Sequence, residues 1–294
     1  LSITNPKDKV VIFSPFYENY GADTILSGAE PIYVPLVPPD FTFSIEQLEN
    51  AFKQGAKALI LCNPSNPCGK VFTFEELTAI ADVVKKYDAY VVTDEVYEHI
   101  VYAPNKHIYM QALDGMRERT IVCNSLSKTY SITGWRLGYV IANPEIIDRV
   151  KKVHDFLTVG AAAPLMEAAT VGLKFDDKYY DELAAHYAHM KEVFVGGLEK
   201  LGLKYTDPQG AYYVLVDVSE FGVKDDVKFC EWLAQYVGVA AVPGSSFFRE
   251  DVNNLIRFHF AKQDDTLNEA INRLAGLRNC LLYTSPSPRD RTRS

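Results

Sequence analysis

The chain has few of the features that mark secreted, membrane-spanning or metal-binding proteins. Its five cysteines are odd in number and widely spaced, and no CxxC pair occurs among the 294 residues. This pattern favours reduced thiols, and therefore a cytoplasmic location, over a disulfide framework or a zinc site. No apolar run approaches the ~20 residues that a membrane span needs. No basic segment followed by an apolar stretch indicates a signal peptide.

Signatures of nucleotide and nucleic-acid binding are also missing. Gly69-Lys70 has no upstream glycine at the P-loop spacing, and no GxGxxG motif follows a strand-like segment. Acidic residues outnumber basic ones by 38 to 30, which argues against nucleic acid or an anionic membrane surface as the main partner. His186 and His189 lack a cysteine or carboxylate at ligand spacing, so we expect surface histidines and no metal.

The composition and the apolar pattern predict an α/β protein with a large core. Hydrophobic residues make up 48% of the chain. Short Val- and Ile-rich segments alternate with helical patterns, and Thr73 with Glu76 forms a capping box. The predicted strands are Val10–Phe13, Pro31–Leu36, Ala58–Cys62, Tyr90–Thr93, Ile121–Asn124 and Leu137–Ala142. This alternation predicts a mostly parallel sheet flanked by helices on both faces.

The pattern changes after about residue 173 and predicts a smaller α+β domain. A long helical pattern covers Asp177–Leu201. The elements expected after it are strands Gly210–Val218, Val239–Val242 and Leu255–Phe260, and helices Asp225–Val237 and Asp264–Leu277. We therefore expect a large domain over residues 1–175, and a linking helix with a small C-terminal domain over 176–280. Residues 281–294, LLYTSPSPRDRTRS, resemble a non-native tail, with a natural disordered tail as the alternative.

Polar residues follow two of the predicted strands, where open α/β sheets bind ligands. The loop Asn63–Gly69, NPSNPCG, comes directly after Ala58–Cys62, and its two Asn-Pro steps predict a rigid turn. The segment Thr93–Tyr97, TDEVY, closes the next strand. A carboxylate there needs a partner because unpaired burial is costly. A helix N-cap is the alternative role for Asp94.

A lysine and two arginines stand near two further strands. Residues 125–130, SLSKTY, follow a buried strand, and Arg136 lies eight residues beyond Lys128. A partly desolvated lysine near another cation has a lowered pKa and becomes a nucleophile, whereas a solvated loop lysine is the commoner case. Serine and arginine are good phosphate ligands. Arg257, within IRFHF, offers a planar fork that matches a carboxylate, or forms a structural ion pair.

Together these groups suit one cofactor, pyridoxal 5'-phosphate (PLP). An aspartate can keep a pyridine nitrogen protonated, a lysine can form a Schiff base, and serine with arginine can hold a phosphate. A distant arginine can hold a substrate carboxylate.

The motifs resemble those of the class I/II aminotransferases of PLP fold type I. NPSNPCG, TDEVYEHIVY, SLSKTYSITGWRLGY, PGSSFF and IRFHFAK occur in family order, and the resemblance covers about residues 6–277. The aspartate, aromatic, kynurenine and methionine aminotransferases look most similar. The resemblance implies a large PLP-binding domain with a mostly parallel sheet and a smaller C-terminal α+β domain.

The resemblance implies roles for five residues around the cofactor ring. Lys128 would form the Schiff base and move the proton at the substrate Cα. Asp94 would pair with the pyridine nitrogen. Tyr97 and Asn66 would bind the phenolic oxygen, with Asn66 also near the substrate. Tyr17 would stack on the ring, although a core aromatic is the alternative.

The resemblance also implies the phosphate and substrate contacts. Ser125 and Arg136 would bind the phosphate, with Ser127 a weaker candidate. Arg257 would hold the substrate α-carboxylate, and Gly210-Ala211-Tyr212 would border the substrate pocket.

The implied activity is ping-pong transamination between an L-amino acid and a 2-oxo acid, in a homodimeric enzyme. A PLP-dependent β-lyase on the same scaffold and a non-catalytic PLP-sensing domain of a transcription regulator stay open as alternatives. Family members have a further N-terminal stretch that helps to hold the phosphate. Because residue 1 is Leu and not Met, we expect a truncated chain that binds PLP weakly or folds poorly.

Overall fold

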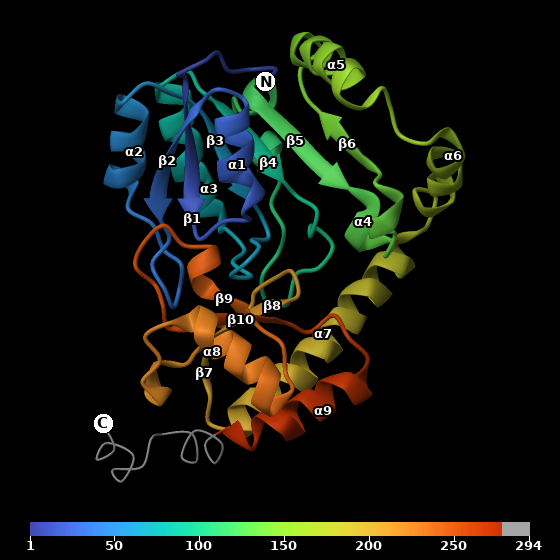
Figure 1. The fold of residues 1–294 in the computed structure, drawn as a ribbon. Helices are drawn as coiled ribbons and strands as arrows, with labels where there is room; N and C mark the ends of the chain where they lie inside the picture. Colours follow the sequence, from blue (N-terminus) through green and yellow to red (C-terminus); the bar gives the residue numbers. More distant parts are fainter. Residues whose placement is uncertain (278–294) are drawn as a thin grey trace.

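Two β-sheets organise residues 1–277, the part of the chain that the computed structural model describes (Figure 1). The predicted tail, residues 281–294, lies outside this part. The first sheet has the order β2-β1-β3-β4-β5-β6, and only the β5–β6 pair is antiparallel. Its strands are β1 (Lys9–Ser14), β2 (Glu30–Pro35), β3 (Ala56–Cys62), β4 (Tyr90–Asp94), β5 (Thr120–Ser125) and β6 (Gly138–Ile141).

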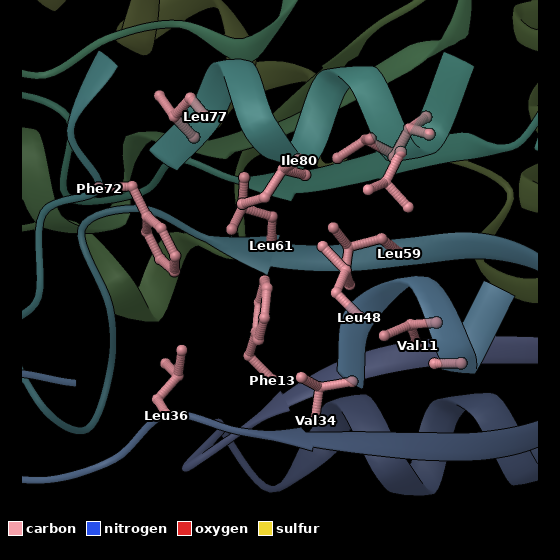
Figure 2. Close-up of a cluster of buried hydrophobic side chains, with 14 of the residues drawn as sticks. Val11, Phe13, Val34, Leu36, Leu48, Leu59, Leu61, Phe72, Leu77 and Ile80 are labelled. Atoms are coloured by element: carbon pink, nitrogen blue, oxygen red, sulfur yellow. The ribbon is translucent and has the colours of Figure 1, made fainter. Parts of the chain in front are cut away.

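Helices cover both faces of this sheet because its strands are apolar on both sides. On one face Phe13 and Leu61 pack against α2 (Ile45–Lys53) and α3 (Phe74–Lys86) (Figure 2). On the other face Val10 and Ile12 belong to a cluster that includes Tyr20 of α1 (Asn19–Leu26). The predicted capping box is confirmed, with both of its hydrogen bonds present at the start of α3. The mostly parallel, helix-covered sheet expected from the sequence is therefore the one observed.

The second sheet is antiparallel and has the order β7-β8-β10-β9. Its strands are β7 (Lys204–Tyr205), β8 (Tyr213–Asp217), β9 (Val242–Pro243) and β10 (Leu255–His259). Helix α7 (Asp177–Lys200) runs from the first sheet toward the second and packs with α9 (Asp264–Leu274) against it (Figure 1).

The remaining helices are short or lie at the edge of the molecule. They are α4 (Leu126–Thr129), α5 (Pro144–Thr158), α6 (Ala163–Gly172) and α8 (Asp226–Trp232), which continues as a π-helical turn over Leu233–Val237. Single 3-10 turns cover Met110–Ala112, Arg117–Arg119, Thr133–Trp135, Ser219–Phe221 and Gly244–Ser246. No helix of the described residues is long and apolar enough to cross a membrane.

Two sequence expectations differ from the structure. The predicted strand Val239–Val242 is wrong for most of its length, because only Val242 and Pro243 pair with β10. Gly238 has a left-handed φ of 75°, so the chain turns there, and its pairing with β10 begins only at Val242. The predicted strand Gly210–Val218 begins only at Tyr213, and Gly210 instead bridges Val101.

Apolar side chains remain exposed near the β6 edge of the first sheet. All four residues of β6 are exposed. On α5 and just beyond it, Phe156 is 91% and Val159 is 82% exposed. Exposed apolar groups of this kind often mark an association surface.

Candidate active site

The parallel strands bring chemically active residues to one edge of the first sheet. Cys62 at the end of β3 pairs in register with Asp94, and Asp94 pairs with Cys123 near the end of β5. A cavity of about 420 Å³ lies beside this edge. All nine residues predicted to form the site line it, namely Tyr17, Asn66, Asp94, Tyr97, Ser125, Ser127, Lys128, Arg136 and Arg257.

A larger cavity of about 730 Å³ lies between β10 and α9. It shares Arg257 with the strand-end cavity but contains neither the lysine nor the aspartate of that site. The smaller cavity is therefore the candidate active site, because it holds the groups that can do chemistry.

Lys128 is partly buried on α4, the short helix that follows β5. Burial lowers the pKa of its amine, the positive charge of Arg136 lowers the pKa further, and the carboxylate of Asp94 opposes both effects. A larger fraction of the amine is therefore neutral near pH 7, which is the form that attacks a carbonyl carbon. The solvated-lysine alternative does not describe this side chain.

Asp94 is held by a tyrosine that the sequence analysis missed. The Tyr20 hydroxyl donates to Asp94 Oδ2 at 2.6 Å, and the Val96 N–H donates to Oδ1 at 3.3 Å. Burial raises the pKa of Asp94, and these two hydrogen bonds oppose the rise by favouring the anion. The signal in the sequence is the position of Tyr20 three residues after Tyr17. In the structure the two rings meet edge to face at 5.7 Å.

Two serines and an arginine line the same cavity and could bind an anion. Ser125 Oγ lies 2.7 Å from Ser127 Oγ and also accepts the Ser127 N–H at 3.1 Å. Arg136 has a left-handed backbone with φ 56°, and its Nη1 donates to the Thr133 carbonyl at 2.8 Å. Hydroxyls and a guanidinium around one cavity suit a phosphate.

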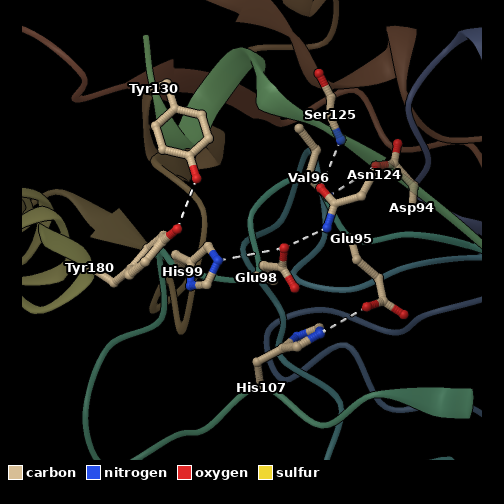
Figure 3. Close-up of polar contacts among 10 residues, drawn as sticks. All are labelled: Asp94, Glu95, Val96, Glu98, His99, His107, Asn124, Ser125, Tyr130 and Tyr180. Atoms are coloured by element: carbon tan, nitrogen blue, oxygen red, sulfur yellow. Dashed lines mark hydrogen bonds and ion pairs between the residues drawn. The ribbon is translucent and has the colours of Figure 1, made fainter. Parts of the chain in front are cut away.

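A network of polar side chains adjoins Asp94 and Ser125 (Figure 3). Asn124 donates to Glu98 Oε1 at 2.5 Å and accepts the Ser125 N–H at 2.7 Å. Carboxylate and imidazole atoms of Glu95, Glu98 and His107 lie within 4.8 Å of one another. His107 Nε2 lies 3.2 Å from Glu95 Oε2, and Glu98 accepts a hydrogen bond from Asn124. Because each carboxylate already has a partner, we assign this cluster no metal.

Arg257 reaches the cavity from β10 in the second sheet. Its guanidinium carbon lies 4.4 Å from the Tyr213 ring centre and 4.3 Å from that of Phe247, between the two rings. Nη1 donates to Asn66 Oδ1 at 2.7 Å, and Nε is buried with no hydrogen-bond partner among the described residues. No carboxylate of the described residues lies within ion-pair distance, so the structural ion pair is not observed. The guanidinium can therefore bind a carboxylate from outside the chain.

Tyr97 faces the same cavity from the segment after β4. Its phenolic oxygen lies 3.0 Å from that of Tyr213, and burial raises the pKa of Tyr97. The phenol is therefore neutral near pH 7 and can donate a hydrogen bond to a ligand oxygen. Tyr17 is 36% exposed at the mouth of the cavity, with its ring available to stack.

This set of groups fits a phosphorylated pyridine aldehyde. Lys128 offers an amine for an aldehyde, Asp94 an anion for a protonated ring nitrogen, and the Ser125 group a phosphate site. Arg257, with an unpartnered buried Nε, offers a site for a carboxylate. One cavity thus carries groups suited to the aldehyde, ring nitrogen and phosphate of such a cofactor and to the carboxylate of an amino acid.

Comparisons with known proteins point the same way. The family described as aminotransferase class I and II matches residues 1–274. The chain is 35% identical to a probable N-succinyldiaminopimelate aminotransferase of Mycobacterium tuberculosis, over 94% of this chain and 73% of that protein. It is 35% identical to kynurenine–oxoglutarate transaminase 3 of Rattus norvegicus, over 91% and 66%. The solved N-succinyldiaminopimelate aminotransferase of M. tuberculosis superposes with a TM-score of 0.90 at 36% identity, covering 94% of this chain and 73% of that one.

Proposed function

Because this chain belongs to the class I and II aminotransferases, we propose that the cavity at the ends of β3, β4 and β5 is its transamination site. The family uses PLP and transfers an amino group from an amino acid to a 2-oxo acid by a ping-pong mechanism. When bound, PLP supplies an aldehyde for the amine and a ring that accepts electrons. The proposal concerns which residues of this chain do the remaining work.

Five residues would hold the phosphate, the ring nitrogen and one ring face of the cofactor. Ser125, Ser127 and Arg136 surround the phosphate position with two hydroxyls and a positive charge. The Asp94 carboxylate, whose anionic form two hydrogen bonds favour, would hold the proton on the pyridine nitrogen. Tyr17 would cover one face of the ring.

The substrate would be oriented by groups from both sheets. Arg257 would bind the α-carboxylate through its planar fork, which Tyr213 and Phe247 hold in place. Tyr97 and Asn66 would donate hydrogen bonds to the cofactor's phenolic oxygen. The lowered pKa of Lys128 would let its amine take the proton from the substrate Cα and pass it to the C4′ carbon of the cofactor.

The observation that carries this proposal is that one cavity joins Lys128, Asp94 and Arg257, which come from three separate parts of the chain. The test is the visible absorption spectrum of the protein with PLP, beside Lys128→Ala and a control, Lys151→Ala, whose lysine is 73% exposed on α5. We expect a protein-bound band in the wild type and control that is absent from Lys128→Ala. A band that persists in Lys128→Ala would refute the lysine assignment.

We also propose a cytoplasmic homodimer with the domain division given by the sequence, residues 1–175 and 176–280. Cys62, Cys68, Cys123 and Cys230 are free thiols, which suits a reducing compartment. The exposed apolar groups of β6 and α5 supply a surface that a second copy can cover. Light scattering at several protein concentrations tests the dimer, and a monomer at every concentration would refute it.

A further inference from the structure

We propose that Glu18 makes this site discriminate against amino donors that carry a second carboxylate. The preferred donor then has a neutral or cationic side chain. This inference rests on the proposed function, because it concerns the side chain of the substrate that Arg257 binds.

The cavity has no spare positive charge for a second carboxylate. Its cationic residues within the described chain are Lys128, Arg136 and Arg257. The proposed function uses each of them, for the cofactor aldehyde, its phosphate and the substrate α-carboxylate. A distal carboxylate on the substrate would therefore lose water without gaining a cation from these residues, which is costly.

Glu18 adds a negative charge to the lining of the cavity. It precedes α1, between Tyr17 and Asn19, and its side chain is exposed to the cavity. The negative charge of Glu18 acts on Arg257 and partly offsets the lowering of the arginine's pKa by burial. Glu18 is therefore within electrostatic reach of the place where the α-carboxylate binds.

The two acidic residues of the cavity, Asp94 and Glu18, differ in their hydrogen-bond partners. Asp94 accepts hydrogen bonds from Tyr20 and Val96. No hydrogen bond or ion pair joins the Glu18 carboxylate to another described residue. Its charge therefore acts on whatever the cavity binds. It opposes the α-carboxylate of every donor equally, and it repels a second carboxylate in addition, which a neutral side chain does not have.

The test compares donors that differ only in charge. Glutamine and glutamate form one pair of similar shape, and asparagine and aspartate form another. We expect wild-type protein loaded with PLP to show a higher kcat/KM for the amide of each pair. In Glu18→Gln we expect this preference to fall by about fivefold to tenfold, the effect of one charge pair across a wet cavity, through faster reaction of the acids. Glu182→Gln, with a carboxylate that is 68% exposed on α7, serves as the matched control.

Two further readouts separate charge from shape. The wild-type preference should shrink as salt is added, whereas that of Glu18→Gln should change little. Calorimetric binding of succinamate and succinate to the loaded protein should show the same preference without turnover. An equal preference in wild type and Glu18→Gln, or a wild-type preference for the acids, would overturn this inference and leave the proposed function intact. If none of the four donors reacts, the calorimetric comparison decides this inference. No transfer from any L-amino acid would refute the proposed function, and this inference with it.

Discussion

Tyr20→Phe tests how strongly one hydrogen bond favours the anionic form of the buried Asp94 carboxyl. The substitution removes one hydroxyl and leaves the ring, so the 2.6 Å hydrogen bond to Asp94 is lost while the packing is kept. A hydrogen bond to a charged group contributes about 1.5–3 kcal/mol. One pKa unit corresponds to about 1.4 kcal/mol. The pKa of Asp94, already raised by burial, should therefore rise by about one to two units further.

The sign of the stability effect follows from the same shift. A carboxyl whose pKa is raised by folding holds its proton more tightly in the folded state, so its ionisation destabilises the protein as pH rises through the folded pKa. Removing the hydrogen bond increases that cost. Tyr20→Phe should lower the free energy of unfolding at pH 7 by about 1.5–3 kcal/mol, and by less at a pH where Asp94 is protonated in both states.

Two measurements check this reasoning. The carboxyl stretch of Asp94, followed by infrared difference spectroscopy against Asp94→Asn in cofactor-free protein, gives the pKa. Urea unfolding at pH 7 and in acid gives the stability difference. Tyr205→Phe is the matched control, because its hydroxyl also donates to a carboxylate, that of Glu199, on the surface. An unchanged pKa of Asp94, or an equal loss of stability at both pH values, would refute the argument.

Three further predictions follow from the cavity and the core. Arg257→Lys should raise KM for the amino donor by about tenfold or more while kcat changes less, because a lysine cannot bind a carboxylate in bidentate fashion; steady-state kinetics checks this, and an unchanged KM would contradict it. Arg136→Gln should raise the pKa of Lys128 toward its ordinary value, since a nearby positive charge is removed, and the pH dependence of amine labelling at Lys128 in cofactor-free protein measures the shift. Leu61→Ala, in the core of the first sheet, should lower the free energy of unfolding by about 2–5 kcal/mol, as measured with urea; a loss below 1 kcal/mol would mean that the site collapses around the cavity.

The local features of the fold followed from the sequence. Apolar segments of the right length predicted all six strands of the first sheet to within a few residues, and the Thr73 capping box is present as predicted. These features depend on residues close together in the chain, where periodicity and side-chain chemistry act directly. The strand Val239–Val242 was wrong because a strand also needs a partner, and the turn at Gly238 delays that pairing.

The residue types of the site also followed from the sequence, whereas their contacts did not. Motifs after three strands indicated a lysine, an aspartate and an anion-binding group, because parallel strands end at one edge of a sheet. Only the tertiary structure brought Tyr20 to Asp94, 74 positions away, and Asn66 to Arg257, 191 positions away. Such contacts form only when tertiary packing brings distant segments together. A local sequence pattern does not indicate which segments will be in contact.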